Sequence, residues 1–190
     1  MTILALIRHM PTTWNRDGRL QGRRDTPLDP DAIPRWRLPP ELTGYRFLSS
    51  PLGRARETAA RLGVEPQIDD RLIEMTWGAW EGHTLRDLRA GFADIDELEA
   101  QGLDFRAPGG ESPRDVQARV APLLAEIAAA GAPTAAITHK GVIRAVFARA
   151  TGWDMRGKPP YRLDWSSAQL FRLDPEGQPA IERLNLSLIA

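Results

Sequence analysis

Two histidines lie at positions where a buried strand is expected to end. His9 follows the aliphatic run Ile3–Ile7 and Arg8, and His139 follows the segment Ala135–Thr138. A lone histidine is more often structural than catalytic. In open α/β sheets, however, ligands bind outside the carboxyl ends of the strands. We therefore expect both imidazoles and the Arg8 guanidinium to face one crevice, although the chain separates them widely.

Arg54 and Glu74 add a cation and a carboxylate that suit the same crevice. The segment Ser49–Arg54 is another strand end that turns into a helix, where free N–H groups and an arginine fork both favour an oxyanion. Glu74 precedes the aromatic loop Trp77–Gly82, and a carboxyl group beside bulky rings can have a raised pKa and act as a general acid. Considered alone, an arginine such as Arg54 is more often a solvated helix residue. Tryptophans such as Trp77 and Trp80 are more often core or wall residues. The prediction depends on their convergence.

The elements that would position these side chains alternate along the chain. We expect strands over Ile3–Ile7, Tyr45–Ser50, Gln67–Asp69, Thr134–Thr138, Ala168–Leu173 and Ile181–Leu186. We expect helices over Leu52–Leu62, Leu85–Ala100, from the Ser112 cap to Ala130, and from Gly141 to Ala150. This alternation predicts an α/β protein with a mostly parallel sheet. The polar segment Thr12–Asp31 is predicted to be a long loop, and loops of this length are usually either functional or disordered.

The composition excludes several classes of function. The 190 residues include 25 basic and 25 acidic ones, so the net charge is zero, which argues against nucleic-acid or membrane partners. Cysteine is absent, which removes disulfides, thiolate metal sites and cysteine nucleophiles. The length suits one domain over residues 1–190. Without a signal-peptide pattern or an apolar stretch of about 20 residues, the expected location is the cytoplasm.

The common nucleotide, zinc and serine-hydrolase motifs are absent from the sequence. It contains no G-x-x-x-x-G-K-[ST], no G-x-G-x-x-G after a strand, no H-E-x-x-H and no G-x-S-x-G. The chemistries that these motifs support therefore fit the sequence poorly.

Six segments, in order along positions 3–145, resemble the motifs of the histidine phosphatase superfamily, which has the phosphoglycerate mutase-like fold. They are Leu6–Asn15, Arg19–Leu28, Ser49–Ala59, Leu72–Gly82, Pro108–Ser112 and Thr138–Gly141. The first is similar to the family's Arg-His-Gly-Glu-Thr/Ser-x-x-Asn signature. Each match is weak alone, but six in order are specific. The resemblance implies a three-layer α/β/α fold with a mostly parallel central sheet, and a small cap-like insertion around residues 75–110.

The resemblance also implies a role for each matching residue. His9 would be the nucleophile that accepts the phosphoryl group, while Arg8, Arg54 and His139 would surround the phosphoryl oxygens. Glu74 would donate a proton to the leaving oxygen and then act as the base for water. Further residues are expected as accessory phosphate contacts (Thr12 and Asn15) or in the pocket wall and its support (Gln21, Gly22 and Glu111).

These roles agree with the physics of phosphoryl transfer. The transition state spreads negative charge over the equatorial oxygens, and the protein mainly positions groups and neutralises charge. His9 would have to attack as a neutral imidazole, whereas a protonated His139 would add positive charge, and neighbouring histidines can differ in this way where their environments differ. Because protein cations would replace Mg²⁺, no metal and no other cofactor is expected.

Two positions depart from the family pattern. Met10 and Pro11 stand where the family has glycine and an acidic residue. If the family needs glycine there for a positive φ angle, the backbone of Met10 would be strained. If it needs glycine so that the backbone can approach the ligand closely, the Met10 side chain would narrow the pocket. Lys140 follows His139, where small or polar residues are common. It is expected either to bind an acidic substrate at the rim or to be a solvated lysine.

The predicted function is metal-independent hydrolysis of a small-molecule phosphate monoester through a phosphohistidine on His9, with inorganic phosphate as product. Mutases of the family carry a long insertion after the Glu74 region, whereas 35 residues (75–109) separate Glu74 from Gly110 here. Two alternatives stay open. One is a phosphoglycerate mutase-type phosphotransferase, and the other, suggested by Met10, is a phospho-ligand-binding protein with weak or lost catalysis. The physiological substrate and the oligomeric state are not readable from the sequence.

Overall fold

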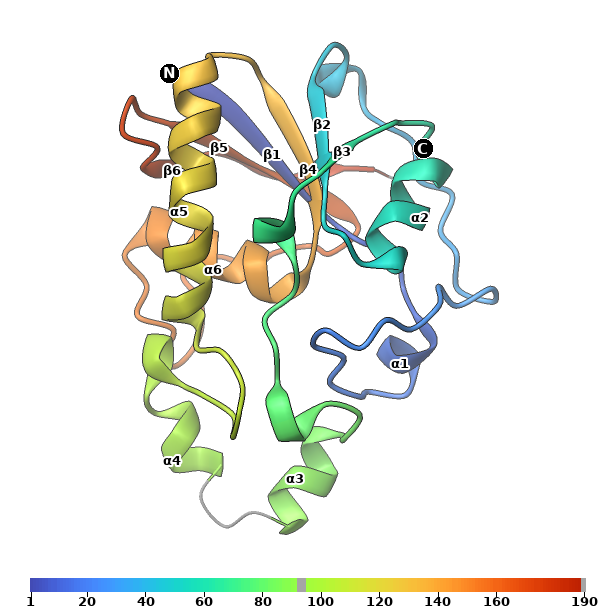
Figure 1. Cartoon of the computed structure of the whole chain (residues 1–190), viewed down its shortest axis with the longest axis vertical. Helices are drawn as coiled ribbons and strands as arrows, with labels where there is room; N and C mark the ends of the chain where they lie inside the picture. Colours follow the sequence, from blue (N-terminus) through green and yellow to red (C-terminus); the bar gives the residue numbers. More distant parts are fainter. Residues whose placement is uncertain (92–94, 189–190) are drawn as a thin grey trace.

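In the part of the chain that the computed structural model describes, residues 1–91 and 95–188, six strands form one mixed sheet. Their order across the sheet is β3-β2-β4-β1-β5-β6 (Figure 1). The strands β1 to β4 are parallel, and β5 and β6 extend the sheet in antiparallel fashion, so the predicted mostly parallel sheet is confirmed. Their bounds are β1 (Thr2–Arg8), β2 (Arg46–Ser49), β3 (Gln67–Ile68), β4 (Thr134–Thr138), β5 (Ser167–Leu173) and β6 (Pro179–Ser187).

Helices cover both faces of this sheet. The α-helices are α1 (Thr13–Arg16), α2 (Gly53–Arg61), α3 (Leu85–Gly91), α4 (Ile95–Glu99), α5 (Pro113–Ala130) and α6 (Lys140–Thr151). Short 3₁₀ turns occupy Pro40–Leu42, Asp70–Leu72, Gly78–Trp80 and Gly102–Asp104. The Ser112 hydroxyl accepts the Asp115 N–H at the start of α5, and the Asp115 carboxylate accepts the Ser112 N–H, so the predicted helix cap is confirmed.

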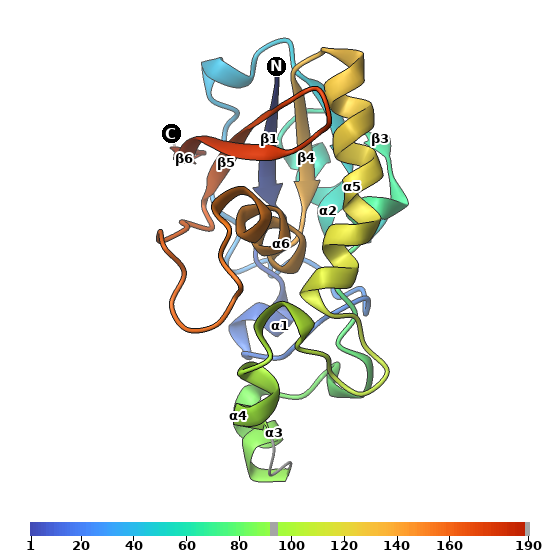
Figure 2. The same ribbon diagram turned by 90° about the vertical axis from the view of Figure 1, so that its left-hand side faces the viewer.

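Alternating residues of β1 divide the interior into two apolar layers. Leu4 and Leu6 join the cluster that packs under α5 and α6, whereas Ala5 and Ile7 join the cluster on the α2 side. Successive side chains of a strand point to opposite faces, so a strand that is apolar throughout must be covered twice. Figures 1 and 2 show the resulting three layers, with α5 and α6 on one face and α2 on the other.

The chain between β3 and α5 reaches beyond the sheet, to the lower end of the molecule in Figures 1 and 2. It has its own apolar cluster of Trp80, Leu88, Ile95 and Ala107. Instead of the single helix expected over Leu85–Ala100, the structure describes α3 and α4, and residues 92–94 between them lie outside the described residues. Among the described helices, none is long and apolar enough to cross a lipid bilayer.

Candidate active site

The carboxyl ends of three neighbouring strands meet at one edge of the sheet. The strands β2, β4 and β1 are adjacent and parallel, so Ser50, His139 and His9 follow them side by side. Hydrogen bonds from His9 N to Thr138 O and from Ser50 N to Ile137 O, both 2.9 Å, continue the ladder past the strand ends. The centres of the two imidazole rings are 5.1 Å apart. The sheet topology therefore brings together the two histidines.

The surroundings of His9 fix both its tautomer and its charge. Its Nδ1 lies 2.7 Å from the carbonyl oxygen of Met10, which can only accept, so Nδ1 carries the proton and donates it. The Nε2 atom consequently holds the lone pair. Burial, together with the charges of Arg8 and Arg54, lowers the pKa of His9 well below the ordinary value of 6.5. At neutral pH, His9 is a neutral imidazole with a nucleophilic nitrogen.

His139 is also neutral, and the expectation that it would be protonated is wrong for the structure as it stands. Its Nε2 lies 2.7 Å from Ser50 Oγ, and its Nδ1 has no hydrogen-bond partner among the described residues. Burial, followed by the effects of His9, Arg54 and Arg8, lowers the pKa of His139 well below 6.5. The two histidines do not differ in charge because the same burial and the same arginines act on both.

Met10 neither strains the backbone nor narrows the pocket. Among the described residues, the non-glycine residues with positive φ angles are Met155 and Asn185. The Met10 side chain is 1% exposed and packs near Leu28 in the apolar layer on the α2 side of the sheet. Its backbone N–H donates to Thr58 Oγ1 at 2.9 Å. Both expectations for Met10 are therefore wrong, because its side chain turns into the core.

Arg54 is a buried cation held by backbone carbonyl groups. It lies in the first turn of α2 and is 2% exposed. Its Nη1 donates to Arg24 O at 2.8 Å and its Nη2 to Gly22 O at 2.7 Å. Asp25 pairs with Nη1 at 3.5 Å and accepts hydrogen bonds from the N–H groups that begin α2. The Nε atom of Arg54 is buried without a partner in the described part of the chain, which leaves one N–H donor unused.

Arg8, the last residue of β1, places a second cation in the same pocket. Its guanidinium carbon lies 5.7 Å from the centre of the Trp165 ring. Its Nε atom is also buried with no partner among residues 1–91 and 95–188. Burial is the largest influence on Arg8 and Arg54, and it lowers the pKa of both. Two desolvated guanidiniums with unused donors next to His9 form a site for an anion, because unpaired buried donors are costly and charge-assisted hydrogen bonds to an oxyanion are strong.

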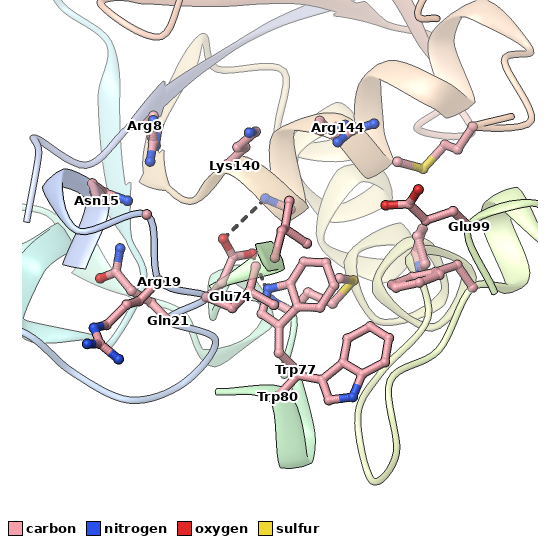
Figure 3. A pocket seen from close by; sticks show the side chains of 18 of the residues that line it. Arg8, Asn15, Arg19, Gln21, Glu74, Trp77, Trp80, Glu99, Lys140 and Arg144 are labelled. Carbon is pink, nitrogen blue, oxygen red and sulfur yellow. Dashed lines mark hydrogen bonds between the residues drawn. The ribbon is translucent and has the colours of Figure 1, made fainter. Parts of the chain in front are cut away.

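Glu74 brings a protonatable carboxyl group to this anion site. It is 8% exposed, its Oε1 accepts the Met75 N–H at 2.7 Å, and its Oε2 accepts the Gly141 N–H at 3.2 Å. Burial raises the pKa of Glu74 above 4.5, although these two N–H groups and the two arginines act in the opposite direction. Figure 3 shows the carboxyl group facing the side of the pocket that Arg8 and Lys140 occupy. A raised pKa suits a group that must carry a proton during the reaction.

An ion pair from α5 holds the backbone on both sides of Glu74. Arg119 donates to the carbonyl oxygen of Ile73 at 2.6 Å and pairs with Glu111 at 3.1 Å. Glu111 in turn accepts the backbone N–H of Thr76 at 3.2 Å. Glu111 thus supports the pocket and is not among its lining residues, which is the second of the two places that the sequence left open for it.

The other expected pocket residues divide between the pocket surface and its support. Asn15 and Gln21 line the pocket. Thr12 is fully buried and caps α1, where its hydroxyl and the Asn15 side chain form a capping box. Gly22 has a φ of 54° and holds Arg54 through its carbonyl group. Neither Thr12 nor Gly22 lies on the pocket surface, so any effect of theirs on a ligand passes through Asn15 and Arg54.

The pocket itself has a volume of about 600 Å³, which exceeds the needs of a phosphate group. His9, Arg8, Arg54 and Glu74 line it together, since the charges of Arg8 and Arg54 act on both His9 and Glu74. The apolar part of the wall includes Leu20, Trp77, Trp80, Leu85, Ile95 and Phe105. Figure 3 shows Trp77 and Trp80 across the pocket from Arg8, Lys140 and Arg144. The cavity therefore offers an anion end together with space for an organic group.

Lys140 lies on the rim of this pocket. It is the first residue of α6 and is exposed, and its Nζ is 5.5 Å from the centre of the Trp165 ring. The Trp165 ring therefore has the cationic groups of both Arg8 and Lys140 beside it.

Four residues of the site are not identified by reasoning from the sequence. Asp25 and Arg119 position Arg54 and the Glu74 segment, and Trp165 and Arg144 contribute to the pocket region. These residues belong to the site through contacts with other segments of the chain. Neither hydrophobic periodicity nor a position at a strand end identifies them in the sequence. The one available signal is that Asp25 falls inside a motif-like loop.

Comparison with known proteins identifies a family and its members. A model of the family described as "Histidine phosphatase superfamily (branch 1)" matches residues 4–187. A glucosyl-3-phosphoglycerate phosphatase of Mycobacterium tuberculosis is 32% identical over 163 residues, which are 76% of this chain and 73% of that protein. A probable phosphoglycerate mutase of Salmonella paratyphi C is 32% identical over 134 residues, which are 66% of this chain and 62% of that protein.

Solved structures share the whole fold. A putative alpha-ribazole-5'-P phosphatase from Escherichia coli aligns with a TM-score of 0.78 and 25% identity, covering 100% of this chain and 98% of that one. A mycobacterial glucosyl-3-phosphoglycerate phosphatase in complex with VO3 aligns with a TM-score of 0.79 and 24% identity, covering 98% of this chain and 100% of that one. The three-layer arrangement described above is therefore found along the full length of these structures.

Proposed function

The chain belongs to the histidine phosphatase superfamily and is a phosphoric monoester hydrolase, and from this premise we propose that it works through a phosphohistidine on His9. The observation that carries the proposal is the pairing of a neutral, Nδ1-protonated His9 with two buried arginines whose Nε donors are unused. A phosphate monoester supplies the oxyanion that those donors lack, and its phosphorus would lie next to the Nε2 lone pair.

The first half of the reaction forms the intermediate. The Nε2 atom of His9 attacks phosphorus, a P–N bond forms, and the ester P–O bond breaks. Glu74 transfers a proton to the leaving oxygen, and burial, which raises the pKa of Glu74, favours the protonated form that this step needs. Arg8 and Arg54 neutralise the charge on the equatorial oxygens, and the Nδ1–H bond to the Met10 carbonyl stabilises the positive charge that develops on the ring of His9.

The second half returns the protein to its starting state. The Glu74 carboxylate takes a proton from a water molecule, whose oxygen attacks the phosphoryl group as the P–N bond breaks. Inorganic phosphate leaves, His9 is neutral again, and Glu74 is protonated again. No step requires a metal ion, since the side chains of Arg8 and Arg54 supply the positive charge.

Both alternatives have less support than hydrolysis. The mutase alternative would need the leaving group to stay bound, and the curated and structural relatives described above include phosphatases in both comparisons. The binding-protein alternative depended on Met10, whose side chain lies in the core and not in the pocket.

Phosphate release in the presence of EDTA tests the proposal. The protein is incubated with a panel of alkyl and aryl phosphates and compared with the variant His9→Gln. We expect release by the unmodified protein, loss of at least a thousandfold in the variant, and an acid-labile, alkali-stable phosphoryl adduct after rapid quenching with labelled ester. Equal release by the two proteins would refute the role of His9. Movement of phosphate between the positions of phosphoglycerate without release would establish the mutase instead.

We also propose that residues 75–110 act as a small cap, because the described residues of this segment, 75–91 and 95–110, extend beyond the sheet and carry most of the apolar pocket wall (Figure 2). A cytoplasmic location, and the absence of nucleic-acid and membrane partners, stay predictions from the sequence. Fractionation of cells that express the tagged protein would test the location.

A further inference from the structure

Two cations of α6 line the pocket beyond the proposed phosphate end. Lys140 and Arg144 are four residues apart on one helix, so their side chains lie one above the other on the same face. Figure 3 shows them in a row with Arg8 along one side of the pocket. The proposed hydrolysis uses Arg8 but gives no role to Lys140 or Arg144.

Within the part of the chain that the structure describes, neither of these cations forms an ion pair. No carboxylate whose side chain the structure describes pairs with Lys140 or Arg144, whereas arginines such as Arg61, Arg114 and Arg172 pair with carboxylates on the surface. Each cation is held against an indole instead: Lys140 Nζ lies 5.5 Å from the Trp165 ring centre and Arg144 5.3 Å from that of Trp153. Desolvation lowers the pKa of both groups, and the charges of Arg8 and then Arg144 lower that of Lys140 further, although Glu74 acts in the opposite direction.

The place of these cations relative to the proposed reaction is set by Glu74. The Gly141 N–H at the start of α6 holds Glu74 Oε2 at 3.2 Å. The oxygen that receives the proton from Glu74 must therefore lie beside the first turn of α6. The organic part of the ester continues from that oxygen, and α6 leads it past Lys140 toward Arg144, about 6 Å further along the helix axis.

From this juxtaposition we propose that Lys140 and Arg144 form a second anion subsite, and that the substrate is a phosphate monoester whose leaving group carries a further carboxylate or phosphate. The proposal rests on the proposed function for the direction of the leaving group. The facing wall of Trp77 and Phe105 is apolar and keeps the local dielectric low, so an anion gains more from the two cations there than it would on an open surface. Glu99 also lines the pocket, but it pairs with Arg89 at 3.4 Å.

The test measures affinity in a protein that cannot turn the ligand over. The variant His9→Gln is titrated calorimetrically with 6-phosphogluconate and with sorbitol 6-phosphate, which differ in a terminal carboxylate against a hydroxyl. A hexitol 1,6-bisphosphate distinguishes phosphate from carboxylate as the second group. We expect the ligands with a second anion to bind about tenfold more tightly or better, as one charge-assisted hydrogen bond would give.

Substitutions on α6 then assign the preference. In the His9→Gln background, Arg144→Gln and Lys140→Gln should each reduce the affinity preference for ligands with a second anion. With both substitutions, the affinities for ligands with and without that anion should differ by no more than about twofold. The conservative variant Arg144→Lys should keep part of the preference. The matched control is Arg149→Gln, which removes a charge from the same helix at a residue that bonds Gln178 outside the pocket. That variant should keep the full preference.

Two results would overturn the subsite: no preference in the His9→Gln protein, or a preference that survives the double substitution at Lys140 and Arg144. Phosphate release by the unmodified protein is measured separately with the same ligands. If the affinity preference holds but no ligand is hydrolysed, the proposed function fails and the subsite stands. If all are hydrolysed without any preference in affinity, the function stands and the subsite fails.

Discussion

Glutamine in place of Glu74 keeps the shape of the side chain and removes the proton that the proposed reaction needs. The amide oxygen can still accept the Met75 N–H, now bonded at 2.7 Å, whereas the Gly141 N–H at 3.2 Å would meet the amide NH₂ group. One buried hydrogen bond is thus lost, at a cost to stability of about 1–3 kcal/mol. The variant no longer buries an ionisable carboxyl group, and this gain in stability offsets part of the cost of the lost hydrogen bond. We therefore expect the variant to fold.

The effect on the rate depends on the leaving group. General acid catalysis contributes about 10²- to 10⁴-fold. An alkyl phosphate releases a strongly basic alkoxide and needs the proton, so Glu74→Gln should lower its kcat/KM by about a thousandfold. Nitrophenolate leaves readily as an anion, so the same substitution should lower kcat/KM for nitrophenyl phosphate by no more than about tenfold.

The pH profile supplies an independent measure of the same group. Glu74 acts in its protonated form, and burial raises its pKa, so kcat/KM for an alkyl phosphate should fall as the pH rises through that raised value. In Glu74→Gln this alkaline limb should disappear. Steady-state kinetics with both esters from acid to alkaline pH provide all of these values. Equal losses on the two esters, or an alkaline limb that persists in the variant, would show that Glu74 only maintains the structure.

Four further predictions concern Met10, Arg54, Arg119 and His9. Met10→Ala should lower the free energy of unfolding by about 2–5 kcal/mol, measured by urea denaturation, and leave kcat/KM within about twofold, because Met10 is a core residue outside the pocket. Arg54→Gln should lower kcat/KM by at least about a hundredfold on alkyl and aryl esters alike, since charge on the phosphoryl oxygens is common to both. Arg119→Gln should lower kcat for alkyl phosphates more than for nitrophenyl phosphate, with little change in KM, because Arg119 holds the backbone before Glu74. Because burial lowers the pKa of His9 well below 6.5, its C–H proton resonances should show no titration between about pH 8 and pH 6.

The sequence alone predicted most of the fold and the core of the site. Continuous apolar runs such as the one before Arg8 indicate strands covered on both faces, and the ends of parallel strands meet at one edge of the sheet. The sequence therefore predicts that Arg8, His9, His139 and Arg54 lie together. The sequence-based predictions were wrong where the property in question depends on residues that are distant in the chain but close in the fold. The region Leu85–Ala100 has a helical pattern, but the structure describes two helices there.

The state of the titratable groups required the tertiary structure. Residue type cannot tell that His9 and His139 are both neutral, since this follows from shared burial and shared arginines. It cannot tell either that Met10 faces the core, because the direction of a side chain after a strand depends on what packs against it.

The sequence by itself determined which groups are available and at which edge of the sheet they gather, because strand polarity and motif order are local properties of the chain. Only the tertiary structure decided how those groups are used. The packing of segments far apart in the chain keeps His9 neutral, buries the Nε donors of Arg8 and Arg54 without a described partner, and holds Glu74 on Gly141. Burial and unpaired charge are properties of the assembled neighbourhood, and no single segment of the chain contains them.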